Sequence, residues 1–121
     1  MTDRFKFRVW NNKMQKFHIV FSMHGIVNDT LEGYAKDDNF VLEQCTGLKD
    51  KNGKLIYEGD IVKLNGKYEI GVYPIVYDES CCEYILTKND KFIYEFYWEV
   101  AENCEVIGNI HENKVLLKEQ D

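Results

Sequence analysis

Apolar and polar residues alternate along most of this chain, and short apolar runs are separated by residues that favour turns. Alternation with a period of two predicts β-strands, because successive side chains of a strand point to opposite faces of the sheet. Residues 5–10 show the pattern clearly, since large apolar side chains alternate there with Lys6 and Arg8. We therefore expect this segment to be a strand with one buried aromatic face.

The same pattern continues to the end of the chain and predicts roughly eight to ten short strands. They are expected at residues 5–10, 14–23, 40–42, 55–57, 61–64, 67–73, 75–77, 84–86, 92–98 and 104–111. Residues 114–118 fit either a closing helical turn or a short strand. Many short strands with frequent turn signals are typical of an all-β barrel or sandwich with little helix.

Two Asn-Gly pairs predict hairpin turns, because both residues tolerate positive φ. Asn52 and Gly53 follow Asp50, whose side chain can accept backbone N–H bonds. Asn65 and Gly66 have the spacing of a two-residue hairpin loop. We expect both pairs to reverse the direction of the chain.

A third bend is expected at Gly59 and Asp60, where glycine allows a tight corner and aspartate can cap its exposed amides. Pro74 should mark an edge or a break, since proline cannot donate to a strand ladder. The strand after Gly59, its hairpin and its return strand resemble the opening of an SH3-like barrel. The sequence therefore predicts an N-terminal β-hairpin region at residues 1–45 and an SH3-like barrel with a short C-terminal cap at residues 46–121.

The chain has 121 residues and a net charge of −6, which suits one domain or a small domain with an N-terminal extension. An acidic total disfavours nucleic acid as a partner, because binding to phosphate draws on Lys and Arg. Lys49, Lys51 and Lys54 are the nearest candidates for a basic face, but beside Asp50 they fit a solvated turn better. No apolar run approaches the roughly 18 residues that span a bilayer, and the N-terminus does not resemble a secretory signal. We expect a cytoplasmic protein without a membrane partner.

The four cysteines are Cys45, Cys81, Cys82 and Cys104. Together with His111 they could form a zinc site, but their spacing differs from that of common zinc fingers and ribbons. Cys104 and His111 are seven residues apart, so on one continuous strand they would face opposite sides and could not act as a nucleophile and its base. We expect reduced, small buried hydrophobic residues, and we assign neither a metal site nor another cofactor.

Two acidic pairs are the other candidates for chemistry, since paired carboxyl groups can do general acid–base work. Asp37 and Asp38 lie in polar loop sequence and fit a solvated position better. Glu58 and Asp60 sit at the predicted corner, where turn formation already accounts for Asp60. No catalytic residue is assigned, and we do not expect an enzyme.

The aromatic run at residues 92–98 is the strongest remaining feature, and it is expected to form one strand with Phe92, Tyr94, Phe96 and Trp98 on the same side. A base-stacking platform is one interpretation, but such platforms need basic neighbours. The neighbours here are acidic: Glu83, Glu95 and Glu99. Core packing or a protein interface fits better, so Tyr94, Phe96 and Trp98 are candidate interface residues.

Three stretches resemble the YopX family of bacteriophage and prophage proteins: FKFRVWNNKM, TGLKDKNGKLIYEGDIVKLNG and EVIGNIHEN. Cys45 and His111 stand where aromatic residues are usual in the family, and Lys114 begins a segment where a Pro-led, Leu-rich turn is usual. The resemblance implies a mostly β fold with an SH3-like barrel, makes self-association plausible and brings no catalytic residues. The residues that carry the turns of these motifs are Thr46, Gly47, Asn52, Gly53, Tyr57, Gly59, Asp60, Asn65, Gly66, Gly108 and Asn109.

The preferred function is therefore a non-enzymatic phage or prophage accessory protein that acts through protein–protein contacts with itself or with an unknown host or phage protein. A nucleic-acid-binding module is the alternative, since small barrels often serve that role. An acidic decoy for a host DNA-binding protein fits the charge but has no positional motif. A hydrolytic or metal enzyme comes last.

Overall fold

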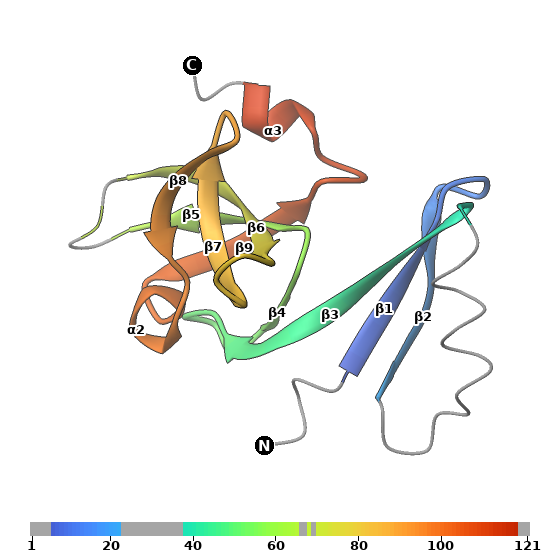
Figure 1. Ribbon diagram of the computed structural model, residues 1–121, viewed down its shortest axis with the longest axis horizontal. Coiled ribbons are helices and arrows are strands. Elements are labelled where there is room, and N and C mark those ends of the chain that lie inside the picture. The colour runs from blue at the N-terminus through green and yellow to red at the C-terminus, as the bar shows by residue number, and fades with distance from the viewer. Residues whose placement is uncertain (1–5, 23–37, 66–67, 69, 119–121) are drawn as a thin grey trace.

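The computed structural model describes residues 6–22, 38–65, 68 and 70–118, and only the backbone of residues 18–22. The fold is all-β as predicted, with two curled antiparallel sheets (Figure 1). The described strands are β1 (Lys6–Asn11), β2 (Lys16–Ser22), β3 (Phe40–Lys49), β4 (Leu55–Tyr57), β5 (Asp60–Leu64), β6 (Gly71–Asp78), β7 (Glu83–Lys88), β8 (Lys91–Glu95) and β9 (Cys104–Asn109). The described helices are single turns, α2 (Trp98–Ala101) and α3 (Val115–Lys118).

The N-terminal sheet has the strand order β2-β1-β3-β4. β3 is ten residues long, whereas the sequence predicted a strand over residues 40–42 alone. Residues 40–44 pair with β1, while Cys45 and Lys49 pair with β4 across a register shift at which Gly47 has a φ of 84°. Such a bulge bends a strand, and Figure 1 shows β3 running from the N-terminal sheet to the barrel. β3 thus crosses the expected boundary between residues 45 and 46.

The second sheet has the strand order β8-β7-β6-β5-β9, and α2 precedes the last strand. β9 returns antiparallel to β5, with Val62 opposite Val106. In this strand order β8 and β9 are the two edges, and β9 lies beside the first strand of the sheet, β5. The predicted barrel is thus present as a curled half-barrel.

The structure corrects two expectations, the two-residue hairpin at Asn65 and Gly66 and the strand edge or break at Pro74. Leu64 pairs with Gly71, so residues 65–70 connect β5 to β6, in place of the two-residue loop expected at Asn65 and Gly66. Asn65 instead donates its backbone N–H to Asn103 O (3.0 Å), and Gly66 lies outside the described residues. Pro74 lies inside β6, where pairing with β5 ends and pairing with β7 begins at Ile75. The missing N–H of proline falls where the strand changes partners.

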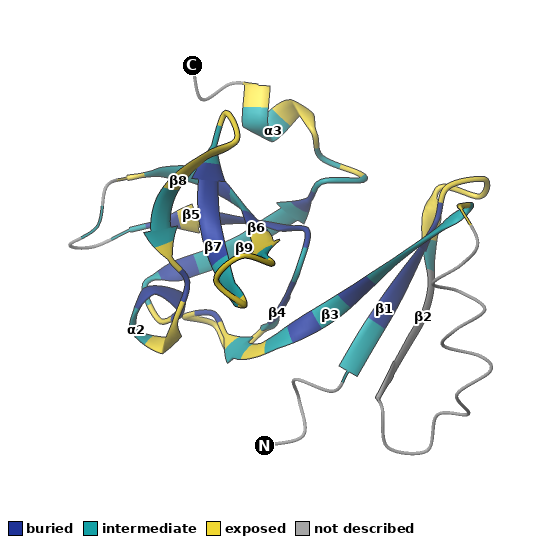
Figure 2. Cartoon of the chain, in the orientation of Figure 1, coloured by how far each residue is buried: buried dark blue, intermediate teal, exposed yellow. Residues whose placement is uncertain are grey.

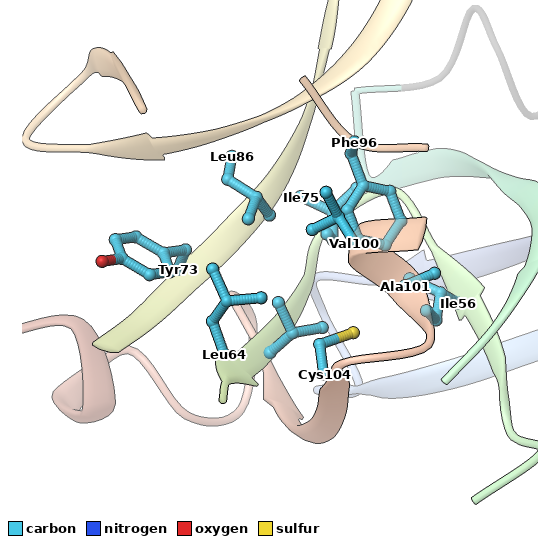
Figure 3. Close-up of a cluster of buried hydrophobic side chains, with 10 residues drawn as sticks. Ile56, Leu64, Tyr73, Ile75, Leu86, Phe96, Val100, Ala101 and Cys104 are labelled. Carbon is cyan, nitrogen blue, oxygen red and sulfur yellow. The ribbon is translucent and has the colours of Figure 1, made fainter. Parts of the chain in front are cut away.

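The barrel core lies between the curled strands and α2 (Figure 3). In β5, Val62 and Leu64 point inward while Lys63 is exposed, which is the alternation that the sequence predicted. Burial of each large aliphatic side chain contributes roughly 1.5–3 kcal/mol to folding. The buried cluster consists of Ile56, Val62, Leu64, Tyr73, Ile75, Leu86, Phe96, Val100, Ala101 and Cys104.

The aromatic run at residues 92–98 is not one strand. β8 ends at Glu95, and Trp98 begins α2. Phe96 lies between them, donates its N–H to Tyr84 O (2.9 Å) and buries its ring in the core, where it is only 6% exposed. Phe96 is therefore a core residue, and almost none of its surface is left for the interface role that the sequence suggested.

Candidate functional site

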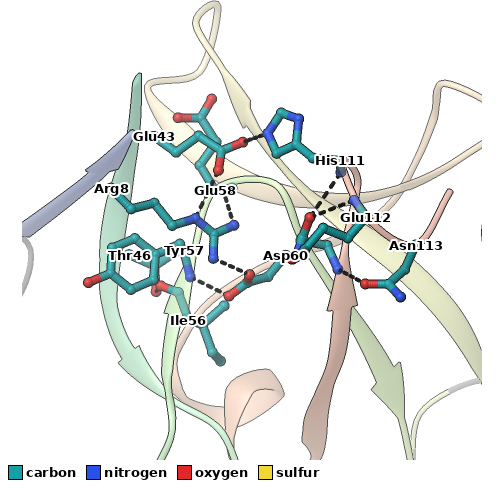
Figure 4. Close-up of polar contacts among 11 residues, drawn as sticks. Arg8, Glu43, Thr46, Ile56, Tyr57, Glu58, Asp60, His111, Glu112 and Asn113 are labelled. Atoms are coloured by element: carbon teal, nitrogen blue, oxygen red, sulfur yellow. Dashed lines mark hydrogen bonds and ion pairs between the residues drawn. The ribbon is translucent and has the colours of Figure 1, made fainter. Parts of the chain in front are cut away.

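A network of buried charged groups joins the N-terminal sheet to the barrel (Figure 4). Arg8 of β1 is 8% exposed, although its strand was expected to bury the aromatic side chains. Its Nε lies 2.9 Å from Oε1 of Glu43, and its Nη1 lies 2.7 Å from Oδ1 of Asp60. Its Nη2 donates to the backbone carbonyl of Glu58 at 3.2 Å. One guanidinium thus holds β1, β3 and the corner before β5 together.

Aromatic rings cover the guanidinium of Arg8. Its Cζ lies 4.4 Å from the centre of the Phe17 ring and 4.9 Å from the centre of the Tyr57 ring. A cation over aromatic rings gains electrostatic attraction, and the rings also exclude water. These contacts stabilise a charge that would otherwise be costly to bury.

Glu43 has a second partner, His111, whose Nε2 lies 2.9 Å from Glu43 Oε2. The imidazole stacks on the Trp10 indole with ring centres 4.7 Å apart and planes 9° apart. Phe17 meets the same two rings edge-on. His111 therefore attaches the segment after β9 to the N-terminal sheet through ring stacking on Trp10 and a polar contact with Glu43.

Asp60 uses both carboxylate oxygens inside the network, since Oδ1 meets Arg8 and Oδ2 accepts the Tyr57 N–H at 2.8 Å. Burial raises the pKa of the Asp60 carboxyl above its ordinary value, against the opposing effects of Arg8 and the Tyr57 N–H. Burial and the charge of Glu43 likewise raise the pKa of Glu58. The carboxyl of Asp60 is 2% exposed and fully engaged, so it forms the corner as predicted and offers no access to a substrate.

The motif at the end of β3 is held by side-chain hydrogen bonds to the backbone. Thr46 Oγ1 donates to Ile56 O at 2.8 Å and accepts the Leu48 N–H at 3.1 Å. These bonds tie the bulge at Gly47 to β4. Thr46 and Gly47 thus have a structural role: they form and fix the bend of β3 next to β4.

Asp50 organises the turn that follows. Its Oδ1 accepts the N–H groups of Asn52 and Lys54 at 2.9 Å each, and its Oδ2 accepts that of Val106 at 2.9 Å. Burial raises the pKa of Asp50, but these three donors and the charge of Lys54 outweigh it and leave the pKa below its ordinary value. Gly53 has a φ of 83°, as an Asn-Gly turn requires.

The segment after β9 is capped by Asn109. Its Oδ1 accepts the N–H groups of His111 and Glu112 at 3.0 Å each, and its own N–H donates to Asn113 Oδ1 at 3.1 Å. The Asn113 side chain packs over Gly108, where a Cβ would lie 2.6 Å from Asn113 Oδ1. Gly108 and Asn109 therefore shape the turn that presents His111 to Glu43.

An open hollow of about 350 Å³ lies between the end of β3 and α2. Residues 47–50 line one side, and Trp98, Ala101 and Glu102 line the other. We call these residues together the Trp98 surface. Trp98 is 61% exposed, and Figure 2 shows the exposed colour at α2. An exposed indole beside a hollow can bind an apolar or cationic group.

The structure separates the three candidate interface residues. Tyr94 is half-buried and meets Tyr68 edge-on, with ring centres 5.6 Å apart. Phe96 lies in the core, and Trp98 points outward. Tyr97 is also exposed, as is Phe92 on β8. Trp98 alone of the three keeps most of its side chain accessible.

The family model described as YopX protein matches residues 6–118. The chain belongs to the YopX family. Among solved structures, protein EF1440 from Enterococcus faecalis is similar with a TM-score of 0.53 and 22% sequence identity, over 93% of this chain and 96% of that chain. This likeness shows a shared fold. No curated protein matches the chain.

The three stretches that carry the YopX resemblance meet in space at the buried network. The first contributes Arg8, the second Tyr57 and Asp60, and the third Asn109 and His111. The second and third are also neighbouring strands, since Asp60 is the register partner of Asn109. These motifs therefore encode the junction between the N-terminal sheet and the barrel.

The structure places the three departures from the usual YopX pattern. His111 stacks its ring on Trp10, and its Nε2 lies 2.9 Å from Glu43 Oε2. Cys45 is fully buried. The segment that begins at Lys114 leads into α3, which settles the open choice between a helical turn and a strand.

The four cysteines fall into a buried pair and an exposed pair. Cys45 and Cys104 are buried, whereas Cys81 and Cys82 are exposed at the turn after β6, so the expectation of burial was wrong for that pair. Burial, with the charges of Asp50 and Asp60, raises the pKa of Cys104 to about 12, which is the opposite of what a thiolate nucleophile needs. Cys104 therefore packs in the core as a small hydrophobic residue.

Within residues 6–22, 38–65, 68 and 70–118, no three His, Cys, Asp or Glu side chains are grouped as metal ligands would be. Of the acidic pair at residues 37 and 38, Asp38 is exposed and Asp37 lies outside the described residues. The helices in the described part of the chain are too short to cross a bilayer.

Proposed function

We propose that this YopX-family chain is a non-enzymatic phage or prophage accessory protein that acts through protein–protein contacts at the Trp98 surface. One observation carries the proposal: Trp98 leaves 61% of its surface in water at the edge of a hollow. Tryptophan is enriched among the residues that dominate binding energy at protein interfaces.

The non-enzymatic part of the proposal is supported by the way the buried charges are used. Arg8, Glu43, Asp60 and His111 satisfy one another at 2.7–2.9 Å. Their geometry holds two sheets together, which is a structural task. Catalysis would instead need a titratable group that faces a substrate.

We place the protein in the host cytoplasm, where thiols remain reduced. Cys81 and Cys82 are neighbouring exposed residues, and neither of them forms a disulfide. Neighbouring exposed thiols fit a reducing compartment better than an oxidising one.

Self-association is part of the proposal, and size-exclusion chromatography with light scattering tests it. A strict monomer at micromolar concentration would remove that part.

The central test is affinity capture from host lysate with the full chain, compared side by side with the Trp98→Ala and Phe92→Ala variants. Phe92 is 58% exposed and lies outside the Trp98 surface, so it is a matched control. We expect a protein that the wild type and Phe92→Ala capture and Trp98→Ala loses. That protein, once purified, must form a complex of defined stoichiometry with the wild type. Capture that is identical for all three chains would overturn the proposal.

A nucleic-acid-binding module is the second candidate, favoured by Lys49, which lines the hollow together with Trp98. An indole next to a cation is the minimal element of single-strand binding, where a base stacks on the ring and a phosphate meets the cation. A gel shift at low salt tests this candidate, because even non-specific binding is strong under that condition.

A further inference from the structure

We propose that the Trp98 surface binds a basic segment of its partner protein, with an arginine or lysine side chain lying on the Trp98 indole. The inference rests on the proposed function, because it names the chemistry of the partner at the same surface. It follows from the exposed ring, the charges around it and the size of the hollow.

The ring itself favours a cation. The face of an indole attracts cations more strongly than the face of any other aromatic side chain in proteins. Trp98 opens α2, and the N–H of Glu102 donates to its carbonyl at 3.0 Å, so the two residues lie one turn apart on the same side of the helix. Glu102 is exposed beside the ring and lines the same hollow. A cation on the indole would therefore lie close to a carboxylate.

The charges around the ring are more acidic than basic. The lining contains Asp50 and Glu102 against Lys49, and Glu99 follows Trp98 directly. Asp50 keeps its negative charge at neutral pH, because its oxygens accept three backbone N–H groups. Lys51 and Lys54 lie in the turn that Asp50 organises, where Lys51 lies 3.8 Å from a carboxylate oxygen of Glu105 and the charge of Lys54 acts on Asp50. With these two cations opposed by Glu105 and Asp50, Glu99 and Glu102 remain against Lys49.

The whole chain has the same sign, with a net charge of −6. A negative surface attracts a basic partner during the encounter and repels phosphate. The charges thus favour a basic segment over a nucleic acid at the Trp98 surface.

The hollow sets the scale of the contact. Its volume of about 350 Å³ is at the small end of ligand-binding pockets. That space admits one long side chain with its neighbouring backbone, but not the face of a helix. Gly47 and Leu48 provide a wall along which the methylene groups of an arginine or lysine can lie. The occupant is therefore expected to be an extended segment.

Fluorescence polarisation of labelled eight-residue peptides tests the inference with the full chain. The probes alternate glycine with arginine, lysine or glutamate, and an eight-nucleotide oligothymidine is the fourth probe. We expect the arginine peptide to bind best, the lysine peptide more weakly and the glutamate peptide not at all. Oligothymidine that binds more tightly than the arginine peptide and depends on Trp98 would overturn the inference in favour of nucleic acid.

Matched variants locate the binding. Trp98→Ala should lower the affinity for the arginine peptide at least tenfold. The affinity of Trp98→Phe should lie between those of Trp98→Ala and the wild type. Glu102→Lys should lower the affinity for the arginine peptide at least fivefold at 50 mM salt. Glu79 is an exposed acid on the turn after β6, and Glu79→Lys should change this affinity less than twofold. Equal effects of the two charge reversals would show attraction by the overall charge alone and would sink the inference. Thermal melting checks that each variant is folded.

The two proposals fail in different ways. If lysate capture depends on Trp98 but the arginine peptide neither binds nor competes with the captured protein, the basic partner is wrong and the proposed function stands. If the wild type and Trp98→Ala capture the same proteins equally well, the proposed function itself fails. Competition by the arginine peptide against the captured protein supports both.

Discussion

Arg8 Nη1 lies 2.7 Å from Asp60 Oδ1, and this ion pair fastens the N-terminal sheet to the first strand of the barrel. Both side chains are almost completely buried. A buried charge is tolerated only when its partners satisfy it, so Arg8 and the two carboxylates around it depend on one another. The N-terminal sheet and the barrel are therefore coupled through a few polar atoms.

Arg8→Ala should be among the most destabilising single substitutions in the chain. It leaves Glu43 and Asp60 buried without their cation, and breaking a buried pair in this way costs about 3–5 kcal/mol of unfolding free energy. Urea denaturation followed by circular dichroism measures the change. Lys13→Ala, which removes an exposed cation next to β1, should stay within about 0.5 kcal/mol of the wild type. A loss below about 1 kcal/mol for Arg8→Ala would mean that the network contributes little.

Gly59→Ala and Gly53→Ala form a matched pair of substitutions. The two glycines have φ values of 88° and 83°, so alanine is strained by about 1–2 kcal/mol at either position. A Cβ on Gly59 would fall on the Glu43 carboxylate, whereas a Cβ on Gly53 meets nothing within 4 Å. Gly59→Ala should thus cost about 1–3 kcal/mol more than Gly53→Ala, because it adds overpacking to strain. Equal losses for the two variants in urea denaturation would contradict the close approach of Gly59 to Glu43.

Local signals in the sequence were enough to predict most of the strands and several of the turns. Alternation located most of the strands approximately, the Asn52-Gly53 pair predicted a turn that Asp50 caps, and Gly59 with Asp60 formed the expected corner. Each of these features depends on residues within a few positions of one another. A period of two or a glycine at a bend is therefore visible without any knowledge of the fold.

The buried network was missed because its partners are distant in the sequence. Arg8 and Glu43 are 35 residues apart, and strand alternation gave no reason to bury a basic side chain. The long β3 was missed for a similar reason, since its two halves pair with different strands. Phe96 was misplaced because β8 ends at Glu95 and breaks the period. The sequence signal that points to the network is Arg8, a basic residue within the aromatic strand β1.

Asp50→Asn should remove part of the acid sensitivity of the fold. The pKa of Asp50 is lowered from its ordinary value of 3.8, so the folded state favours the charged carboxylate. The stability from this group is therefore present above pH 4 and is lost as the pH falls below that value. The Asn side chain can still accept the bonds at Oδ1, but its NH₂ would face the Val106 N–H, so the loss at pH 7 should be about 1–3 kcal/mol.

Urea denaturation from pH 7 to pH 2.5 measures this effect. The stability of the wild type should approach that of Asp50→Asn at the acid end, because protonation removes the same interaction in the wild type. Asp38→Asn, at an exposed aspartate, is the control and should follow the wild-type curve. A constant difference between Asp50→Asn and the wild type across the pH range would contradict the assignment.

Thiol reactivity should divide the four cysteines into two pairs. Cys81 and Cys82 are exposed, while Cys45 and Cys104 are fully buried and the pKa of Cys104 is raised to about 12. An aromatic disulfide reagent at pH 8 should therefore modify two thiols rapidly, and the other two only after unfolding in guanidinium, because a buried neutral thiol is a poor nucleophile. The double variant Cys81→Ser/Cys82→Ser should lose the rapid phase and keep two thiols in guanidinium. A third rapid thiol in the wild type would show that the barrel opens around Cys104 or the junction around Cys45. Mass spectrometry of the modified peptides would then identify which of the two it is.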